Sequence, residues 1–144
     1  MVKLRAVLGL ALALVTAVGC GVSKDKTAAQ GVAEACFESV KRKDFQGVLQ
    51  CYSPKFFENT SREKWTKMLQ NVNAKLGDLQ DYEIVGWNFR KFAGLGGGTY
   101  LHLQYNVTYS KYPAQEILTL YRPLTGGEFK IVAHGINSPG FLEE

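Results

Sequence analysis

Apolar residues recur with a helical period after Thr27, where Thr27 and Gln30 have the spacing of a capping box. The positions that share one helix face are Ala29, Val32, Ala33, Cys36, Phe37 and Val40. The basic run at 41–43 suits a helix C-terminus, where the helix dipole favours cations. The pattern therefore predicts a first helix that begins near Thr27 and ends in this run.

The pattern predicts two further helices before the middle of the chain. Asp44 is a suitable cap for a short helix that ends before Ser53-Pro54. Its expected buried residues are Phe45, Val48, Leu49 and Tyr52. A third helix is expected to open at the capping box Thr60–Glu63 and to stop at Gly77, a suitable C-cap. Its expected buried residues are Trp65, Leu69, Val72 and Leu76.

From Tyr82 onward, apolar and polar residues alternate with period two, as in strands that are buried on one face. We expect four strands, at about 82–90, 99–109, 115–124 and 128–136. The inward positions on the first two strands are Val85, Trp87, Phe89, Leu101, Leu103, Tyr105, Val107 and Tyr109. Gly126-Gly127 signals a hairpin turn between the last two strands. The glycine-rich stretch 94–98 precedes a strand rather than a helix, which favours a flexible hairpin loop over a phosphate loop.

These elements predict an α+β fold in which three N-terminal helices pack on a curved four-stranded antiparallel meander sheet. The chain has 144 residues, of which 46% are hydrophobic, enough for one domain. We place that single domain at 28–138 and a C-terminal tail at 139–144.

The first residues have the form of a secretory signal. Lys3 and Arg5 precede a stretch, residues 6–18, that has no charged residue and is too short to span a membrane. Residues 17–20 (Ala-Val-Gly-Cys) resemble the bacterial lipobox, in which the cysteine is acylated and becomes the new N-terminus. The resemblance implies a signal peptide at 1–19, a lipidated Cys20 with a tether at 20–27, and a site on the periplasmic face of the outer membrane. The alternative is an ordinary signal peptide with an incidental cysteine.

Removal of the signal peptide changes the charge balance. The whole chain carries a formal charge of +4, and Lys3 and Arg5 contribute two of its 17 basic residues. The remainder is near neutral and has no basic stripe, so we expect no nucleic-acid partner.

The order of the predicted elements resembles the nuclear transport factor 2-like superfamily, within which small bacterial lipoprotein domains of unknown function are the nearest match. The residues that carry the resemblance are Lys43-Asp44-Phe45, residues 53–57 (Ser-Pro-Lys-Phe-Phe), Ser61 with Trp65, and Leu76-Gly77. The resemblance implies a cone-like sheet that curls around the helices, often with a cavity at its open end. Members include isomerases, dehydratases, transport factors and non-catalytic proteins, and they often pair through the second sheet face. A homodimer is therefore one expected arrangement.

The sequence contains no motif for catalysis, metal binding or a cofactor. None of the inward positions on the first two strands is acidic, and no Cys/His cluster has zinc-ligand spacing. We therefore assign no catalytic residue, no metal and no cofactor. His102 and His134 are expected on sheet faces. Trp87, Tyr105, Tyr109 and His134 are candidates to line a small-ligand cavity, the alternative being that they fill the core.

Cys36 and Cys51 remain once Cys20 is acylated. They flank the expected turn near residues 43–44 at similar distances, so two helices that fold back on each other would bring the thiols level. A disulfide between them is one expectation in an oxidising compartment. The alternative is a pair of reduced, buried core cysteines.

The sequence supports an expectation only about the general class of function, binding protein or enzyme. The predicted anchor and the lack of an acid at those inward positions favour a non-enzymatic, lipid-anchored envelope protein that binds a protein partner or a small apolar ligand. The alternative is an isomerase- or hydrolase-like enzyme that uses a cavity lined by tyrosine and histidine. A closed core would favour the first reading. An open pocket with one of the histidines against Tyr105 would favour the second.

Overall fold

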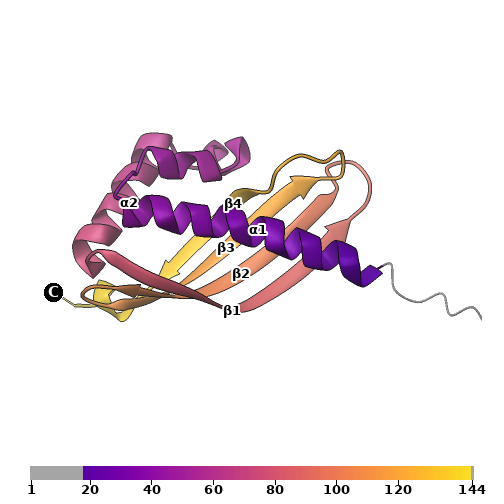
Figure 1. The fold of residues 1–144 in the computed structure, drawn as a ribbon. Coiled ribbons are helices and arrows are strands. Elements are labelled where there is room, and N and C mark those ends of the chain that lie inside the picture. Colours follow the sequence, from indigo (N-terminus) through magenta and orange to yellow (C-terminus); the bar gives the residue numbers. More distant parts are fainter. Residues whose placement is uncertain (1–17, 144) are drawn as a thin grey trace, which may run out of the picture.

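Two α-helices and a four-stranded sheet form the described part of the chain, residues 18–143, in a computed structural model (Figure 1). The elements in order are α1 (Val18–Lys41), the 3-10 helices η1 (Gly47–Cys51) and η2 (Pro54–Glu58), α2 (Arg62–Leu76), β1 (Leu79–Phe92), β2 (Gly98–Tyr109), β3 (Pro113–Pro123), β4 (Lys130–Asn137) and the 3-10 helix η3 (Pro139–Phe141). The α+β class is confirmed. The expected count of three helices is wrong, because only two α-helices form in this part of the chain.

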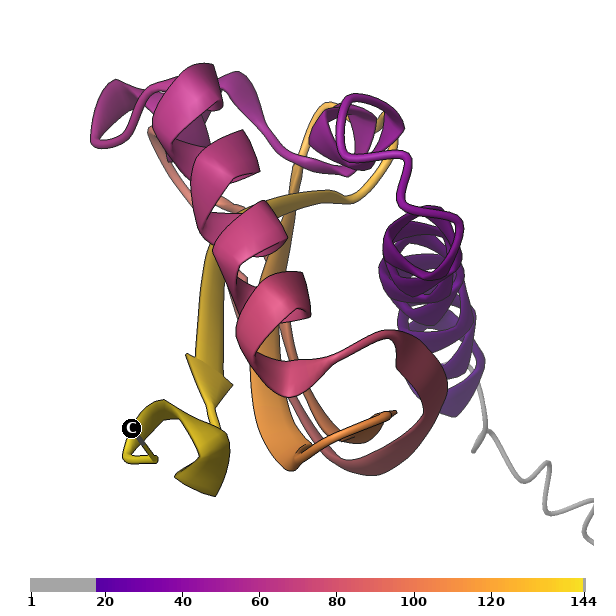
Figure 2. The same cartoon turned by 90° about the vertical axis from the view of Figure 1, so that its left-hand side faces the viewer.

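The sheet is an antiparallel meander with the order β1-β2-β3-β4, as predicted. Helix α1 lies across one face of it (Figure 1). In Figure 2, α1 is seen along its axis while α2 runs across the view, so the two helices cross at a steep angle. Side chains that alternate along β2 and β3 fill the core beneath them. The fully buried ones on these two strands include Leu101, Leu103, Tyr105, Leu118 and Leu120.

The apolar face predicted for the first helix is confirmed, but its start is not. Ala29, Ala33, Cys36 and Phe37 are buried. The helix begins before Thr27, whose hydroxyl donates to the Ser23 carbonyl instead of capping a terminus. The residues expected to form a tether, 20–27, are therefore helical.

Two contacts join these early turns of α1 to the sheet. The Arg122 guanidinium pairs with the Asp25 carboxylate at 2.5 Å. The Lys26 ammonium lies 5.8 Å from the centre of the Trp87 ring. Residues 1–17 of the predicted signal peptide lie outside the described residues.

The second predicted helix is a single 3-10 element, η1. Asp44 does accept a hydrogen bond from the Gly47 backbone N–H at 2.8 Å, as a cap would. The stretch between Asp44 and Ser53-Pro54 is too short for a stable α-helix, and Gly47 weakens it further. The apolar residues still turn inward, because Val48 and Leu49 are buried.

Helix α2 forms where it was predicted, but its cap stands one residue later than Thr60, the first residue of the predicted capping box. Ser61 is the N-cap, and its hydroxyl accepts from the Lys64 backbone N–H. Trp65 and Leu69 are among its buried residues. Gly77 ends the helix at a φ of 91°, a conformation that disfavours other residues, and an added Cβ would press against the Ser110 hydroxyl.

Strand β1 departs from simple alternation. Its register with β2 shifts between Ile84 and Gly86, where a bulge inserts one extra residue. Val85 is consequently 47% exposed instead of inward. Trp87 pairs with Leu103 and so shares the inner face, but it lies on an edge strand and is 48% exposed.

Within the described range, we find no helix that has both the length and the apolarity to span a membrane.

Candidate functional site: a buried chain of hydrogen bonds

Four polar side chains meet in the core, where β2, β3 and β4 lie against the end of η1. The Tyr52 hydroxyl lies 2.6 Å from Nδ1 of His134, and Nε2 of His134 lies 2.7 Å from Oε2 of Glu116. The Tyr109 hydroxyl donates to the other carboxylate oxygen of Glu116 at 2.7 Å. The side chains of His134 and Glu116 are only 3% and 2% exposed, so this is an internal group.

The contacts assign the histidine tautomer. A carboxylate can only accept hydrogen bonds, so Nε2 of His134 carries a proton and donates to Glu116. Nδ1 of the neutral ring then accepts from the Tyr52 hydroxyl. With this assignment every polar atom of His134 and both oxygens of Glu116 have partners, which burial at this depth requires.

The backbone holds Tyr52 against β4. Tyr52 forms an isolated parallel bridge with Ile131, and the backbone N–H of Ser53 donates to the Ile131 carbonyl at 2.8 Å. Glu116 points inward because it shares the phase of the buried Leu118 and Leu120 on β3. His134 lies on β4, the neighbouring strand.

Aromatic rings enclose the group from the helix side. The ring centre of Tyr52 lies 4.7 Å from that of Phe56 and 5.5 Å from that of Trp65. Trp65 also faces the His134 ring, at 5.6 Å between ring centres. These rings come from η1, η2 and α2 and exclude water from the hydrogen-bonded group.

Both phenols of the group stay protonated at neutral pH. Burial raises the pKa of Tyr52 well above its usual value. Burial, together with the charge of Glu116 and the hydrogen bond to it, raises the pKa of Tyr109. Each phenol therefore remains a hydrogen-bond donor.

The chain of contacts continues to two cysteines. The Cys36 thiol donates to the Tyr52 hydroxyl at 4.0 Å, and the neighbouring Cys51 raises the pKa of Cys36. Both cysteines are buried and free, with Cys36 1% and Cys51 9% exposed. Cys36 on α1 and Cys51 on η1 are near enough to shift each other's pKa. The disulfide stays a prediction.

The candidate cavity residues do not share a described pocket. Tyr105 is fully buried, and its hydroxyl has no partner. Tyr109 and His134 meet at Glu116, whereas Trp87 lies at the edge strand. His102 is on the outer face, where Nδ1 lies 2.9 Å from the Thr119 hydroxyl.

Glu116 is an inward-facing acidic side chain that the sequence did not lead us to expect. The inward positions predicted from the sequence, none of them acidic, lay on the first two strands only. Glu116 stands on the third strand, in phase with Ala114, Leu118 and Leu120, and this phase is the signal that could have revealed it. Tyr52 was expected to be an ordinary core residue, and no sequence pattern joins it to His134.

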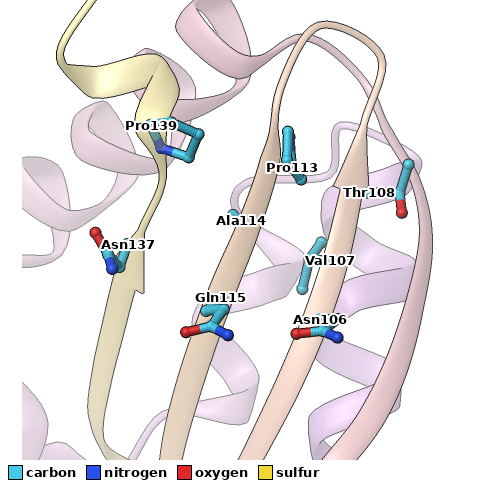
Figure 3. Close-up of a pocket in the computed structure, with 8 residues that line it drawn as sticks. All are labelled: Asn106, Val107, Thr108, Pro113, Ala114, Gln115, Asn137 and Pro139. Carbon is cyan, nitrogen blue, oxygen red and sulfur yellow. The ribbon is translucent and has the colours of Figure 1, made fainter.

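None of the described helices covers the central residues on the outer face of the sheet, where Asn106, Gln115 and Asn137 are exposed. Asn106 pairs with Gln115, which pairs with Asn137, so three amides form a row across three strands. They line a shallow pocket of about 420 Å³ together with Thr108 and Pro139 (Figure 3). Ile117, in the middle strand, is 49% exposed beside them.

Among the described residues, no cluster of histidine, cysteine or acidic side chains is arranged to hold a metal ion.

A family model matches residues 32–134, a span that includes Cys36, Tyr52, Glu116 and His134. Its description is "Protein of unknown function (DUF4019)". The chain belongs to the DUF4019 family. No curated protein matches the chain, and no solved structure does either. For this DUF4019 protein, the geometry of the site therefore carries the functional argument.

Proposed function

We propose that this DUF4019 protein is a non-enzymatic, lipid-anchored protein of the bacterial envelope that binds a protein partner through the outer face of its sheet. The observation that carries the proposal is the contrast between the two sheet faces. The inner face is closed over a hydrogen-bonded group that satisfies itself, whereas the outer face presents Ile117 and a row of uncharged amides.

The chemistry of the outer face fits a protein better than a small apolar ligand. An apolar ligand needs an enclosed apolar pocket. The pocket beside Ile117 is shallow and open, and its lining mixes the amides of a row across three strands with apolar residues such as Val107 and Pro139, a mixture that is typical of protein interfaces. A second copy of the chain is one such partner, in keeping with the expected homodimer.

Cross-linking tests the proposed interface. A photoreactive amino acid at Ile117, on the outer face, is expected to give a discrete cross-linked product in cells. The same probe at Leu95, a fully exposed residue of the β1–β2 hairpin, is the matched control and should give none. If Ile117 yields no product beyond the Leu95 background, the outer face is not a binding surface.

The anchor is tested at Cys20, an exposed residue. Replacing Cys20 with serine removes the thiol that acylation requires. The full-length C20S protein is expected to leave the membrane fraction or to remain unprocessed, since several acyl chains are needed for stable attachment. Ser23→Ala, an exposed change nearby, should leave fractionation unaltered. A processed C20S protein that stays on membranes after a salt wash would contradict the anchor.

The enzymatic alternative has one observation in its favour. A carboxylate that orients an imidazole beside a phenol is an arrangement used in general acid–base catalysis. A substrate would have to reach side chains that are 3% and 2% exposed, behind the rings of Tyr52 and Trp65. The closed site therefore supports binding over catalysis.

The proposal also includes the fold family. The helices on one face of a four-stranded meander are consistent with a cone-like, nuclear transport factor 2-like domain. Fold alone would not assign an activity within that superfamily.

A further inference from the structure

We infer that Cys36 and Cys51 form a redox-active pair that hydroperoxides close to a disulfide, with Cys51 as the attacking thiol and Cys36 as the resolving one. The Tyr52–His134–Glu116 chain takes the proton from Cys36. This role goes beyond the proposed binding function and uses none of the outer-face residues.

The two sulfurs differ in exposure and in the direction of their pKa shifts, as an attacking and a resolving thiol should. Cys36 is deep in the core on α1, whereas Cys51 stands at the end of η1 and retains some exposure. The Lys130 ammonium lies near η1, where it donates to the Gln50 carbonyl at 2.8 Å. A hydrogen bond from Cys36 lowers the pKa of Cys51, burial opposes this, and the charge of Lys130 lowers it further. The hydrogen bond to Cys51 and burial raise the pKa of Cys36.

The attack by Cys51 forms a sulfenic acid. The Cys51 thiolate attacks one oxygen of the hydroperoxide, so a sulfur–oxygen bond forms and the oxygen–oxygen bond breaks. The proton that the Cys51 thiol loses on ionisation passes through solvent water to the leaving hydroxide or alkoxide. Because only 9% of Cys51 is exposed, a small oxidant of this class can reach its sulfur more easily than a folded protein that carries a disulfide.

The resolving step uses the buried chain. The Cys36 thiol passes its proton to the Tyr52 oxygen, while Tyr52 passes its own proton to Nδ1 of His134. The resulting imidazolium forms an ion pair with Glu116. The Cys36 thiolate attacks the Cys51 sulfur, the sulfur–sulfur bond forms, and hydroxide leaves. The proton on His134 finally neutralises that hydroxide, so the sum is two thiols and one peroxide giving one disulfide, water and water or an alcohol.

Hydrogen peroxide is the probe, applied to the reduced full-length protein. Intact and peptide mass spectra are expected to show a Cys51 sulfenic acid first and then a Cys36–Cys51 disulfide. In C36S, the sulfenic acid should persist and be captured by dimedone. In C51S, Cys36 should stay reduced. Reaction at Cys36 before Cys51 in the wild-type protein would overturn the assignment, and this measurement needs no variant.

Tyr52→Phe tests the proton path, because it removes the hydroxyl and keeps the ring. We expect disulfide closure to slow by about 100-fold, the lower range of general acid–base effects. The matched control is Tyr112→Phe, which should close at the wild-type rate. Closure of the disulfide in Tyr52→Phe at the wild-type rate would exclude the relay.

A second comparison tests the oxidant. Disulfide formation with oxidised glutathione but not with hydrogen peroxide would exclude the proposed oxidant. Neither result bears on cross-linking at Ile117, so the two proposals fail separately.

Discussion

Replacing Glu116 with alanine is expected to reduce the free energy of unfolding by about 2–6 kcal/mol, because each of two buried donors left without an acceptor costs about 1–3 kcal/mol. The substitution removes the only acceptor described for two buried donors, Nε2–H of His134 and the Tyr109 hydroxyl. Because a domain of this size is stable by about 5–15 kcal/mol, the variant should lose a large share of its stability. Urea unfolding, followed by tryptophan fluorescence, measures the loss.

Two further substitutions separate the network from simple loss of volume. Glu116→Gln keeps the shape and one oxygen acceptor but faces the other donor with an amide N–H, so a smaller loss of about 1–3 kcal/mol is expected. Glu128→Ala removes a carboxylate that is 83% exposed and should change stability by about 0.5 kcal/mol or less. If Glu116→Ala were no more destabilising than Glu128→Ala, the buried network would not contribute to stability.

Replacing Phe37 with alanine is expected to cost about 3–5 kcal/mol. Phe37 is 1% exposed and packs between two rings, at 4.9 Å between centres for both Tyr82 and Tyr105. Truncation would leave a cavity between α1 and the sheet that these side chains cannot fill. The same urea titration measures the effect.

Leu95→Ala is the matched control for Phe37, since Leu95 stands at the tip of a hairpin and is fully exposed. Its stability should stay within about 0.5 kcal/mol of the wild type. Equal losses for the two variants would mean that the α1–sheet contact is not part of the cooperative core.

The regular elements could be predicted from the sequence because their signals are local. The period of α1 identifies Phe37 as a core residue, and Ser61 and Gly77 mark the ends of α2. The hairpin glycines separate strands that pair in chain order. Each of these features depends on a few neighbouring residues and elementary backbone preferences.

The irregular features could not be predicted in the same way. The bulge near Gly86 depends on the register between β1 and β2, and the position of Tyr52 depends on its backbone bridge to Ile131. The site joins Cys36, Tyr52 and His134, which are 16 and then 82 positions apart. Only the folded chain brings them together. The one local clue was Glu116, an acid in the apolar phase of its strand.

The early turns of α1 would influence the orientation of the domain relative to the membrane if Cys20 carries a lipid. Asp25 and Lys26 fix the helix to Arg122 and Trp87, and Cys20 is five residues earlier in the same helix. At 1.5 Å per residue, a lipid attached at Cys20 would lie about 8 Å along the axis from the Asp25 contact. So short and stiff a connection would give the domain one preferred tilt against the bilayer. Which edges of the sheet face the lipid headgroups, and which face the periplasm, would then be set by the direction of α1.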